Sequence, residues 1–325
     1  MNTLSMRKLH GNGPALSGTP SRPTRFSRLA ATAVLFMLAS AGAANAGLQE
    51  GIQAYQKGDY ASAIRNFKAP ADSGDGEAQY YLGLMSASGH GVPQDPKAAL
   101  GWFQKAAGQG YAAAFHNLGQ MHENGQGVPR DFKTASKFYL KAAEKGYAPS
   151  QFNFGMMYFD GRGVPQDANA AMRWFLKSAD QGYPASQYFL GILFYKGRGV
   201  AQSYKTAFEW FQRAAEKGDA RSLHYIGMMF ENGQGMAQDL SAAVKWYRKS
   251  AEAGNAVSQY AVGVMYAEGK GAPVDLAEAH QWLTLAEKAE VNGARERRLK
   301  IEPKMTEKEF ETSRVMVKAW LVMRK

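Results

Sequence analysis

The most constraining feature of this chain is a glycine pattern that recurs every 36 residues. One glycine of the pattern stands at Gly83, Gly119, Gly155, Gly191, Gly227 and Gly263. Six units share this register without an insertion, from residue 76 to residue 291. A unit of this length buries its apolar face only against its neighbours, so the pattern predicts side-by-side stacking of repeats.

Each unit is predicted to form two helices, called helix A and helix B here. In the first unit, helix A is expected over 77–88, because Ala78 and Leu82 begin an apolar stripe at helical spacing. Helix B is expected to begin at the N-cap Asp95, with Pro96 in its first turn, and to end near Gly110. Its apolar arc is broad, which is typical of a helix packed between neighbours on two sides.

The loop between the two helices repeats as "GVPQD" or a close variant. Its glycines permit positive φ, its proline stiffens the turn, and its aspartate or serine caps helix B. The Gly-Lys-Ser/Thr ending of a phosphate-binding loop is missing, so the loop is interpreted as a structural turn. Gly155 and its equivalents are expected to let helix B approach helix A closely. The aromatic column that includes Trp174 is expected to be buried.

The two ends of the chain depart from the repeat. Residues 1–46 are predicted to be a secretory signal peptide, with a basic start, the apolar run Leu29–Leu38 and a small-residue cleavage site at Ala44–Ala46. An uncleaved membrane anchor is the alternative. Residues 47–75 are predicted to be a degenerate first repeat in the tetratricopeptide style. Residues 292–325 are predicted to be capping helices, and the last of them is expected to begin with a Thr306/Glu309 capping box.

The expected face of the last helix consists of Phe310, Val317, Trp320 and Leu321. We expect this face to cover the final repeat, and the alternative is a helix that binds a membrane surface or a partner. The chain carries a formal charge of +11 and no cysteine. The predicted leader holds five bases and no acid, so the rest carries a mild +6 that does not indicate nucleic acid binding. Periplasmic localisation is predicted, with secretion as the alternative.

The segment "AQYYLGLMSASGHGVPQDPKAALGWFQKAAGQGYA" resembles a Sel-one-like repeat (SLR), a relative of the tetratricopeptide repeat. The resemblance extends over about residues 47–290 and includes the Leu-Gly, Gly-x-Gly-Val-Pro, Trp-aromatic and Ala-Ala elements together. It implies an all-α, right-handed α-solenoid of one degenerate and six full units, with helix A on a concave face. It also implies protein–protein binding, often in envelope regulation, exopolysaccharide control or host interaction. A penicillin-binding or β-lactamase-like branch carries inter-helix cysteines that are absent here.

Three columns of helix A are candidate binding residues, because equivalent positions form ladders in a solenoid. By the resemblance, the first column faces the concave groove: Tyr80, His116, Phe152, Tyr188, His224 and Tyr260. Beside it lie Leu84, Gln120, Met156, Ile192, Met228 and Val264, and then Glu123, Phe159, Tyr195 and Glu231. An exposed ladder of aromatic and methionine side chains is typical of a peptide groove. The alternative is that these side chains pack against the next unit.

A basic column on helix B is interpreted as solvated surface rather than a polyanion site. It contains Lys105, Lys141, Lys177, Arg213 and Lys249, and acids stand three residues after four of them, where ion pairs are expected. The six histidines form no i, i+4 metal pair, and we expect no catalytic residue, metal or cofactor. The leading hypothesis is an exported, non-enzymatic scaffold that binds a partner protein or peptide, with a role in envelope regulation or assembly. The alternatives are a cell-wall enzyme of the same fold and a secreted host-interaction factor.

Overall fold

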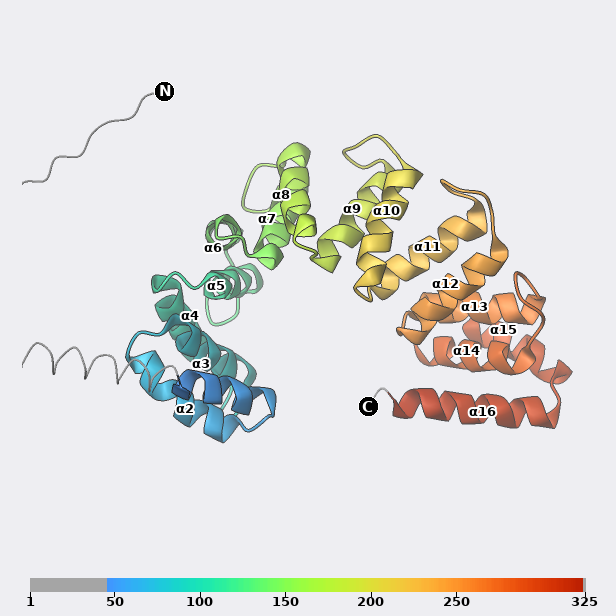
Figure 1. The fold of residues 1–325 in the computed structure, drawn as a ribbon, viewed down its shortest axis with the longest axis horizontal. Coiled ribbons are helices and arrows are strands. Elements are labelled where there is room, and N and C mark those ends of the chain that lie inside the picture. Colours follow the sequence, from blue (N-terminus) through green and yellow to red (C-terminus); the bar gives the residue numbers. More distant parts are fainter. Residues whose placement is uncertain (1–45, 324–325) are drawn as a thin grey trace, which may run out of the picture. The chain divides into compact units, whose positions relative to one another are not determined.

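The computed structural model describes residues 46–323, and this part of the chain contains helices and no strand (Figure 1). It divides into two units after Ser73. The predicted leader lies outside the described residues, except for its last residue, Ala46. The all-α prediction is therefore confirmed for residues 46–323.

The first unit holds one helical hairpin. Residues 46–56 are helical, and α2 spans Tyr60–Asp72 with Asp59 as its side-chain cap. Phe67 of α2 is fully buried, and a Cβ added at Gly51 would lie 2.6 Å from its ring. The degenerate repeat expected over 47–75 covers this hairpin, whose two helices meet through a glycine and an aromatic ring.

The second unit contains six helix pairs of 13-residue helices, followed by a C-terminal segment (Figure 1). Helix A of the six repeats is α3 (Gly76–Ser88), α5 (Ala112–Asn124), α7 (Ala148–Asp160), α9 (Pro184–Lys196), α11 (Ala220–Asn232) and α13 (Ala256–Glu268). Helix B is α4 (Pro96–Gly108), α6 (Phe132–Glu144), α8 (Ala168–Asp180), α10 (Tyr204–Glu216), α12 (Leu240–Glu252) and α14 (Leu276–Lys288). From α3 to α14, consecutive helices pack against each other, so the repeats form an α-solenoid.

The repeated loop ends helix A and starts helix B, as expected. Gly89 closes α3 in the left-handed conformation at φ 73°, and its N–H donates to the carbonyl of Met85. The N–H of Asp95 donates back to Ser86 O at 2.8 Å, while the Asp95 carboxylate caps the first turn of α4.

The glutamine of the motif has a role that the sequence did not indicate. Gln94 Nε2 donates to Ala87 O at 2.9 Å, and this clamp recurs at Gln166, Gln202 and Gln238.

The centre of each repeat is a glycine on helix A facing a large side chain on helix B. A Cβ added at Gly155 would lie 2.6 Å from Cε1 of Phe175, which is fully buried. The partners in the six repeats are Phe103, Tyr139, Phe175, Phe211, Tyr247 and Leu283. The expected close approach is therefore confirmed. The expected position of the buried aromatic was wrong by one residue, because Trp174 is only half-buried and the next residue holds the centre.

Gly155→Val should lower the free energy of unfolding by about 1–3 kcal/mol, because the added atoms meet a ring that cannot leave the core. Gly101→Val is the matched control, since no atom lies within 4 Å of a Cβ added in the middle of α4. We expect the control to be neutral or slightly stabilising, because glycine is a poor helix former. Thermal unfolding followed by circular dichroism measures both. Equal melting temperatures for the two variants would contradict this account of the glycine column.

The C-terminal segment consists of α15 (Ala294–Ile301), a 3₁₀ turn (Glu302–Lys304) and α16 (Glu307–Val322). The predicted capping box is present, with Thr306 and Glu309 exchanging hydrogen bonds. Val317 and Trp320 pack against the core cluster around Trp282, so α16 caps the last repeat as expected. Leu321 lines an open groove between α14 and α16, together with Val317. It is 37% exposed, because the groove is open to solvent at this position.

Candidate functional site

Five of the six side chains in the first predicted column on helix A are half-buried rather than exposed. These side chains rest on the buried side chain of their own helix B and on the start of the next repeat. The Phe152 ring lies 5.7 Å from that of Phe175 and 5.9 Å from that of Tyr183. Tyr188 stacks in the same way on Phe211, at 6.0 Å. The column thus makes the packing contacts that the alternative interpretation expected, and part of each half-buried side chain stays open to solvent.

The remaining members of this column follow the same scheme. The Tyr80 ring lies 5.0 Å from that of Tyr111. Tyr260 is partly buried against the cluster of Ala279, Leu283 and Ile301. His224 is part-buried, and its Nδ1 is hydrogen-bonded to Ser258 Oγ at 2.8 Å. These residues line one surface of the stack, which we call the helix-A face, together with the other two predicted columns.

His116 is a correction, because it is buried and presents no surface to a partner. It is 8% exposed, and its Nδ1 is hydrogen-bonded to Ser150 Oγ at 2.8 Å. The rings of Tyr139 and Tyr147 cover it at 5.5 and 5.3 Å. Burial lowers the pKa of His116 to about 4. The imidazole is therefore neutral at pH 7 and belongs to the core.

The second predicted column is half-buried along its whole length, from Leu84 and Gln120 through Met156, Ile192, Met228 and Val264. The third column forms specific contacts with the next repeat. Glu123 accepts from Arg162 at 3.0 Å, and Phe159 lies under the guanidinium of Arg198 at 5.2 Å. The Tyr195 hydroxyl donates to Gln234 Oε1 at 2.7 Å. These pairs connect helix A to the following glycine loop.

Two repeats carry a tyrosine–carboxylate pair beneath this surface. The hydroxyl of Tyr139 donates to Glu123 at 2.6 Å, and that of Tyr247 donates to Glu231 at the same distance. Burial, and then the adjacent carboxylate, raise the pKa of both tyrosines well above the usual range. The phenols therefore remain protonated donors, and the pairs act as buried hydrogen bonds between the helices of one repeat.

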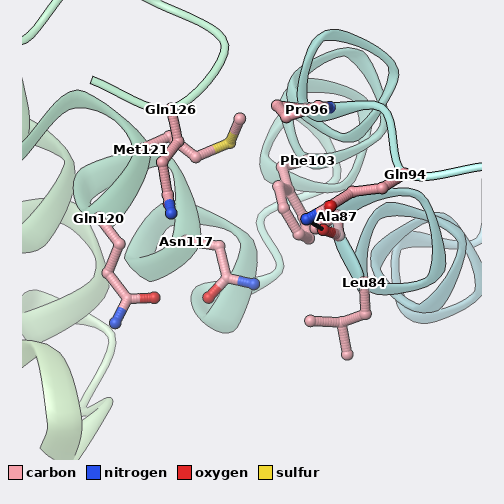
Figure 2. Close-up of a pocket in the computed structure, with 9 residues that line it drawn as sticks. All are labelled: Leu84, Ala87, Gln94, Pro96, Phe103, Asn117, Gln120, Met121 and Gln126. Carbon is pink, nitrogen blue, oxygen red and sulfur yellow. Dashed lines mark hydrogen bonds between the residues drawn. The ribbon is translucent and has the colours of Figure 1, made fainter. Parts of the chain in front are cut away.

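A pocket opens on this face between the first and second repeats (Figure 2). Its volume is about 280 Å³. The lining comprises Leu84, Ala87, Gln94, Pro96 and Phe103 on one side, and Asn117, Gln120, Met121 and Gln126 on the other. Among the described residues, the side-chain amides of Asn117, Gln120 and Gln126 have no hydrogen-bond partner. The pocket thus combines an apolar floor with amides that are available to a ligand.

Of these lining residues, the sequence had indicated only Leu84 and Gln120 as binding candidates. Ala87 carries the signal that was missed. It is one of the two small members, with Ala267, of the column that also contains Glu123, Phe159, Tyr195 and Glu231. A missing large side chain in a ladder leaves space, so the repeat alignment indicates two candidate positions, and the structure assigns this pocket to the one at Ala87.

The basic column on helix B has a different arrangement from the expected one. Lys105 Nζ lies 4.3 Å from the centre of the Trp102 ring, and Lys177 lies at the same distance from Trp174. Arg213 and Lys249 cover Trp210 and Trp246 in turn. Within the described chain, the expected pairing of Lys177 with Asp180 is not formed. These cations cover half-buried indoles, which is a cation–π contact rather than a free basic stripe.

Residues 46–323 contain no group of three or more histidine or acidic side chains placed to hold a metal ion. No helix in that range has the length and the apolar character needed to cross a membrane.

Comparison with known proteins agrees with the repeat geometry. The Sel1 repeat family model matches residues 76–111, 112–147, 148–183, 184–219, 220–255 and 256–290. The comparison with curated proteins gives no match.

Two of the solved structures that match this chain illustrate the shared fold. A protective antigen present in uropathogenic Escherichia coli strains, which displays an SLR fold, is 32% identical with a TM-score of 0.71. The match covers 78% of this chain and 56% of the antigen, so the chain spans little more than half of that protein. A Sel1 repeat protein from Oxalobacter formigenes is also 32% identical with a TM-score of 0.71, over 74% of this chain and 99% of that one. The chain belongs to the Sel1 repeat family.

Proposed function

We propose that this protein is a scaffold that binds an extended segment of a partner protein along the helix-A face. Sel1 repeats commonly mediate protein–protein interaction and typically act as non-enzymatic adaptors. The observation that carries the proposal is the pocket between the first two repeats, where unpaired amides stand beside apolar side chains. An extended peptide needs both kinds of contact, because its main chain requires hydrogen bonds and its side chains require apolar surface.

The rest of the face supports the same function. Met156, Ile192 and Met228 continue the surface beyond the pocket, and each is half-buried against its own repeat. Methionine side chains adapt to different partner shapes. Because these side chains are already held by packing within their repeats, they lose little conformational entropy when a partner binds their exposed side.

Selection of binding segments from a random peptide library tests the proposal. Peptides that bind the full chain should lose about tenfold or more in affinity when Asn117 and Gln120 are both changed to alanine, because two main-chain hydrogen bonds are lost. Gln104→Ala is the matched control, since Gln104 is exposed on helix B and does not line the pocket. Isothermal titration calorimetry measures all three proteins. Undiminished binding to a correctly folded Asn117/Gln120 double variant would exclude this face.

The cellular location belongs to the proposal too. The leader predicted at 1–46 supports export, with the periplasm as the expected compartment and a role in envelope regulation or assembly. Fractionation of cells into cytoplasm, periplasm and medium tests this. Recovery from the medium would favour the alternative of a secreted factor, and recovery from the cytoplasm would contradict export.

A further inference from the structure

The pocket between the first two repeats exists because one column of helix A shrinks to a methyl group at Ala87. In the next three repeats this position is filled by the chain itself. Glu123 is held by Arg162, while Phe159 packs edge-on against Phe189 with ring centres 5.3 Å apart. Tyr195 then occupies the position in the fourth repeat. The space beside Ala87 is therefore the location of a side chain that the first repeat lacks.

Tyr195 shows what such a side chain contacts. Its ring lies 6.4 Å from that of Phe211 and 5.4 Å from that of Tyr225. Its hydroxyl donates to Gln234 Oε1 at 2.7 Å. The ring thus rests on the buried aromatic of its own repeat, and the phenol reaches the glutamine in the glycine loop of the next repeat.

Three repeats earlier, both of these partners are present without the tyrosine. Phe103 stands at the position of Phe211, and Gln126 stands at the position of Gln234. Both line the pocket, and the Gln126 amide has no partner among the described residues (Figure 2). An aromatic platform and a hydrogen-bonding amide are therefore retained around an empty position.

The side of the pocket formed by the second repeat is more polar than the equivalent surface next to Tyr195, which favours binding of a peptide main chain. Asn117 and Gln120 replace Tyr225 and Met228, so amides stand where the fourth repeat has a ring and a thioether. Unpaired amides beside the pocket can hydrogen-bond the main chain on either side of an inserted residue. The volume of about 280 Å³ lies just below the range of small-molecule sites, roughly 300–1,000 Å³, and suits a single side chain.

We propose that this pocket binds a tyrosine side chain from an extended segment of the partner protein. The ring lies against Phe103, the phenol hydrogen-bonds the Gln126 amide, and Asn117 and Gln120 hold the adjacent main chain. This inference rests on the proposed function and names the residue that the helix-A face recognises there.

The test uses capped pentapeptides with a central tyrosine, phenylalanine or alanine between glycines, titrated into the full chain. Nuclear magnetic resonance follows the side-chain amide signals of Asn117, Gln120 and Gln126. The tyrosine peptide should shift these signals saturably, and the alanine peptide should not. The phenylalanine peptide should bind on the order of 2- to 10-fold more weakly, because it lacks one hydrogen bond. Tyrosine and alanine peptides that behave alike would overturn the assignment.

Two variants separate binding from folding. Ala87→Tyr supplies the missing side chain from within, so it should keep or raise the melting temperature and weaken tyrosine-peptide binding at least tenfold. Gln126→Ala should make tyrosine and phenylalanine peptides bind equally. Undiminished tyrosine-peptide binding to a folded Ala87→Tyr protein would refute the pocket assignment.

The same variants distinguish this inference from the broader function. Library-selected peptides that still bind Ala87→Tyr but fail on the Asn117/Gln120 double variant would leave the scaffold function standing and refute the tyrosine pocket. Selected peptides that bind both variants as tightly as the unmodified chain would refute the two together.

Discussion

Phe175→Ala should lower the free energy of unfolding by about 3–5 kcal/mol, which is a large fraction of the stability of most domains. Phe175 is fully buried and packs against Gly155 across the centre of the third repeat. Its ring also lies 4.8 Å from that of Phe189 in the fourth repeat. Removal of the ring therefore leaves a cavity that affects one repeat and its interface with the next.

The neighbouring Trp174→Ala variant is the control for this prediction. Trp174 is larger but only half-buried, with Lys177 over its ring, so its truncation should cost less than that of Phe175. Because repeats are stabilised mainly by nearest neighbours, Phe175→Ala should first weaken hydrogen-exchange protection in α7, α8 and α9. Denaturant unfolding and hydrogen exchange measure the two effects. A larger loss for Trp174→Ala would show that the tryptophan column, and not the residue after it, forms the core.

Lowering the pH from 7 to 4 should destabilise the protein, and His116 should account for about 3 kcal/mol of the loss. The pKa of His116 is about 4 in the folded chain, because burial disfavours the charged imidazole. An unfolded histidine has a pKa of about 6.5. Between these two pH values the unfolded state binds more protons, so the free energy of unfolding falls as the pH decreases. The contribution of neutral His116 to the free energy of unfolding is complete above about pH 6.5 and is lost near pH 4.

Two other histidines act in the same direction. Burial also lowers the pKa of His224 and of His280, whose Nδ1 is hydrogen-bonded to Ser313 at 2.7 Å. His116→Gln keeps a polar group near Ser150 and removes one titrating site. Urea unfolding at pH 7, 6, 5 and 4 should therefore show a shallower pH dependence for this variant. The carboxylates titrate equally in both proteins, so an identical slope would contradict the assignment to His116.

Local patterns predicted the elements of the fold because short-range physics determines them. Gly89 with Asp95 marks the end of helix A and the start of helix B, since positive φ and side-chain capping act over a few residues. The Thr306/Glu309 capping box was found in the same way. The periodicity of the glycines also predicted the stacking, because a short helical pair can bury its apolar face only against another.

Burial within a helix was harder to predict, because adjacent positions differ by a rotation that the sequence alone does not determine. Trp174 and Phe175 are both aromatic neighbours on α8, and only the contact with Gly155 assigns the core to Phe175. His116 shares a column with Phe152 and Tyr188, yet it is only 8% exposed beneath the rings of Tyr139 and Tyr147 and belongs to the core. The predicted groove residues therefore include both side chains of the core and side chains that remain partly open to solvent.

The sequence by itself determined that this chain forms paired helices in six equal repeats, because spacing, capping and turn chemistry are encoded within each 36-residue unit. Only the tertiary structure decided which side chain of each helix lies at the centre of its repeat and where the stack leaves a pocket. Both depend on contacts between residues far apart in the chain. The space beside Ala87 is a candidate binding site because the next repeat places side-chain amides opposite it.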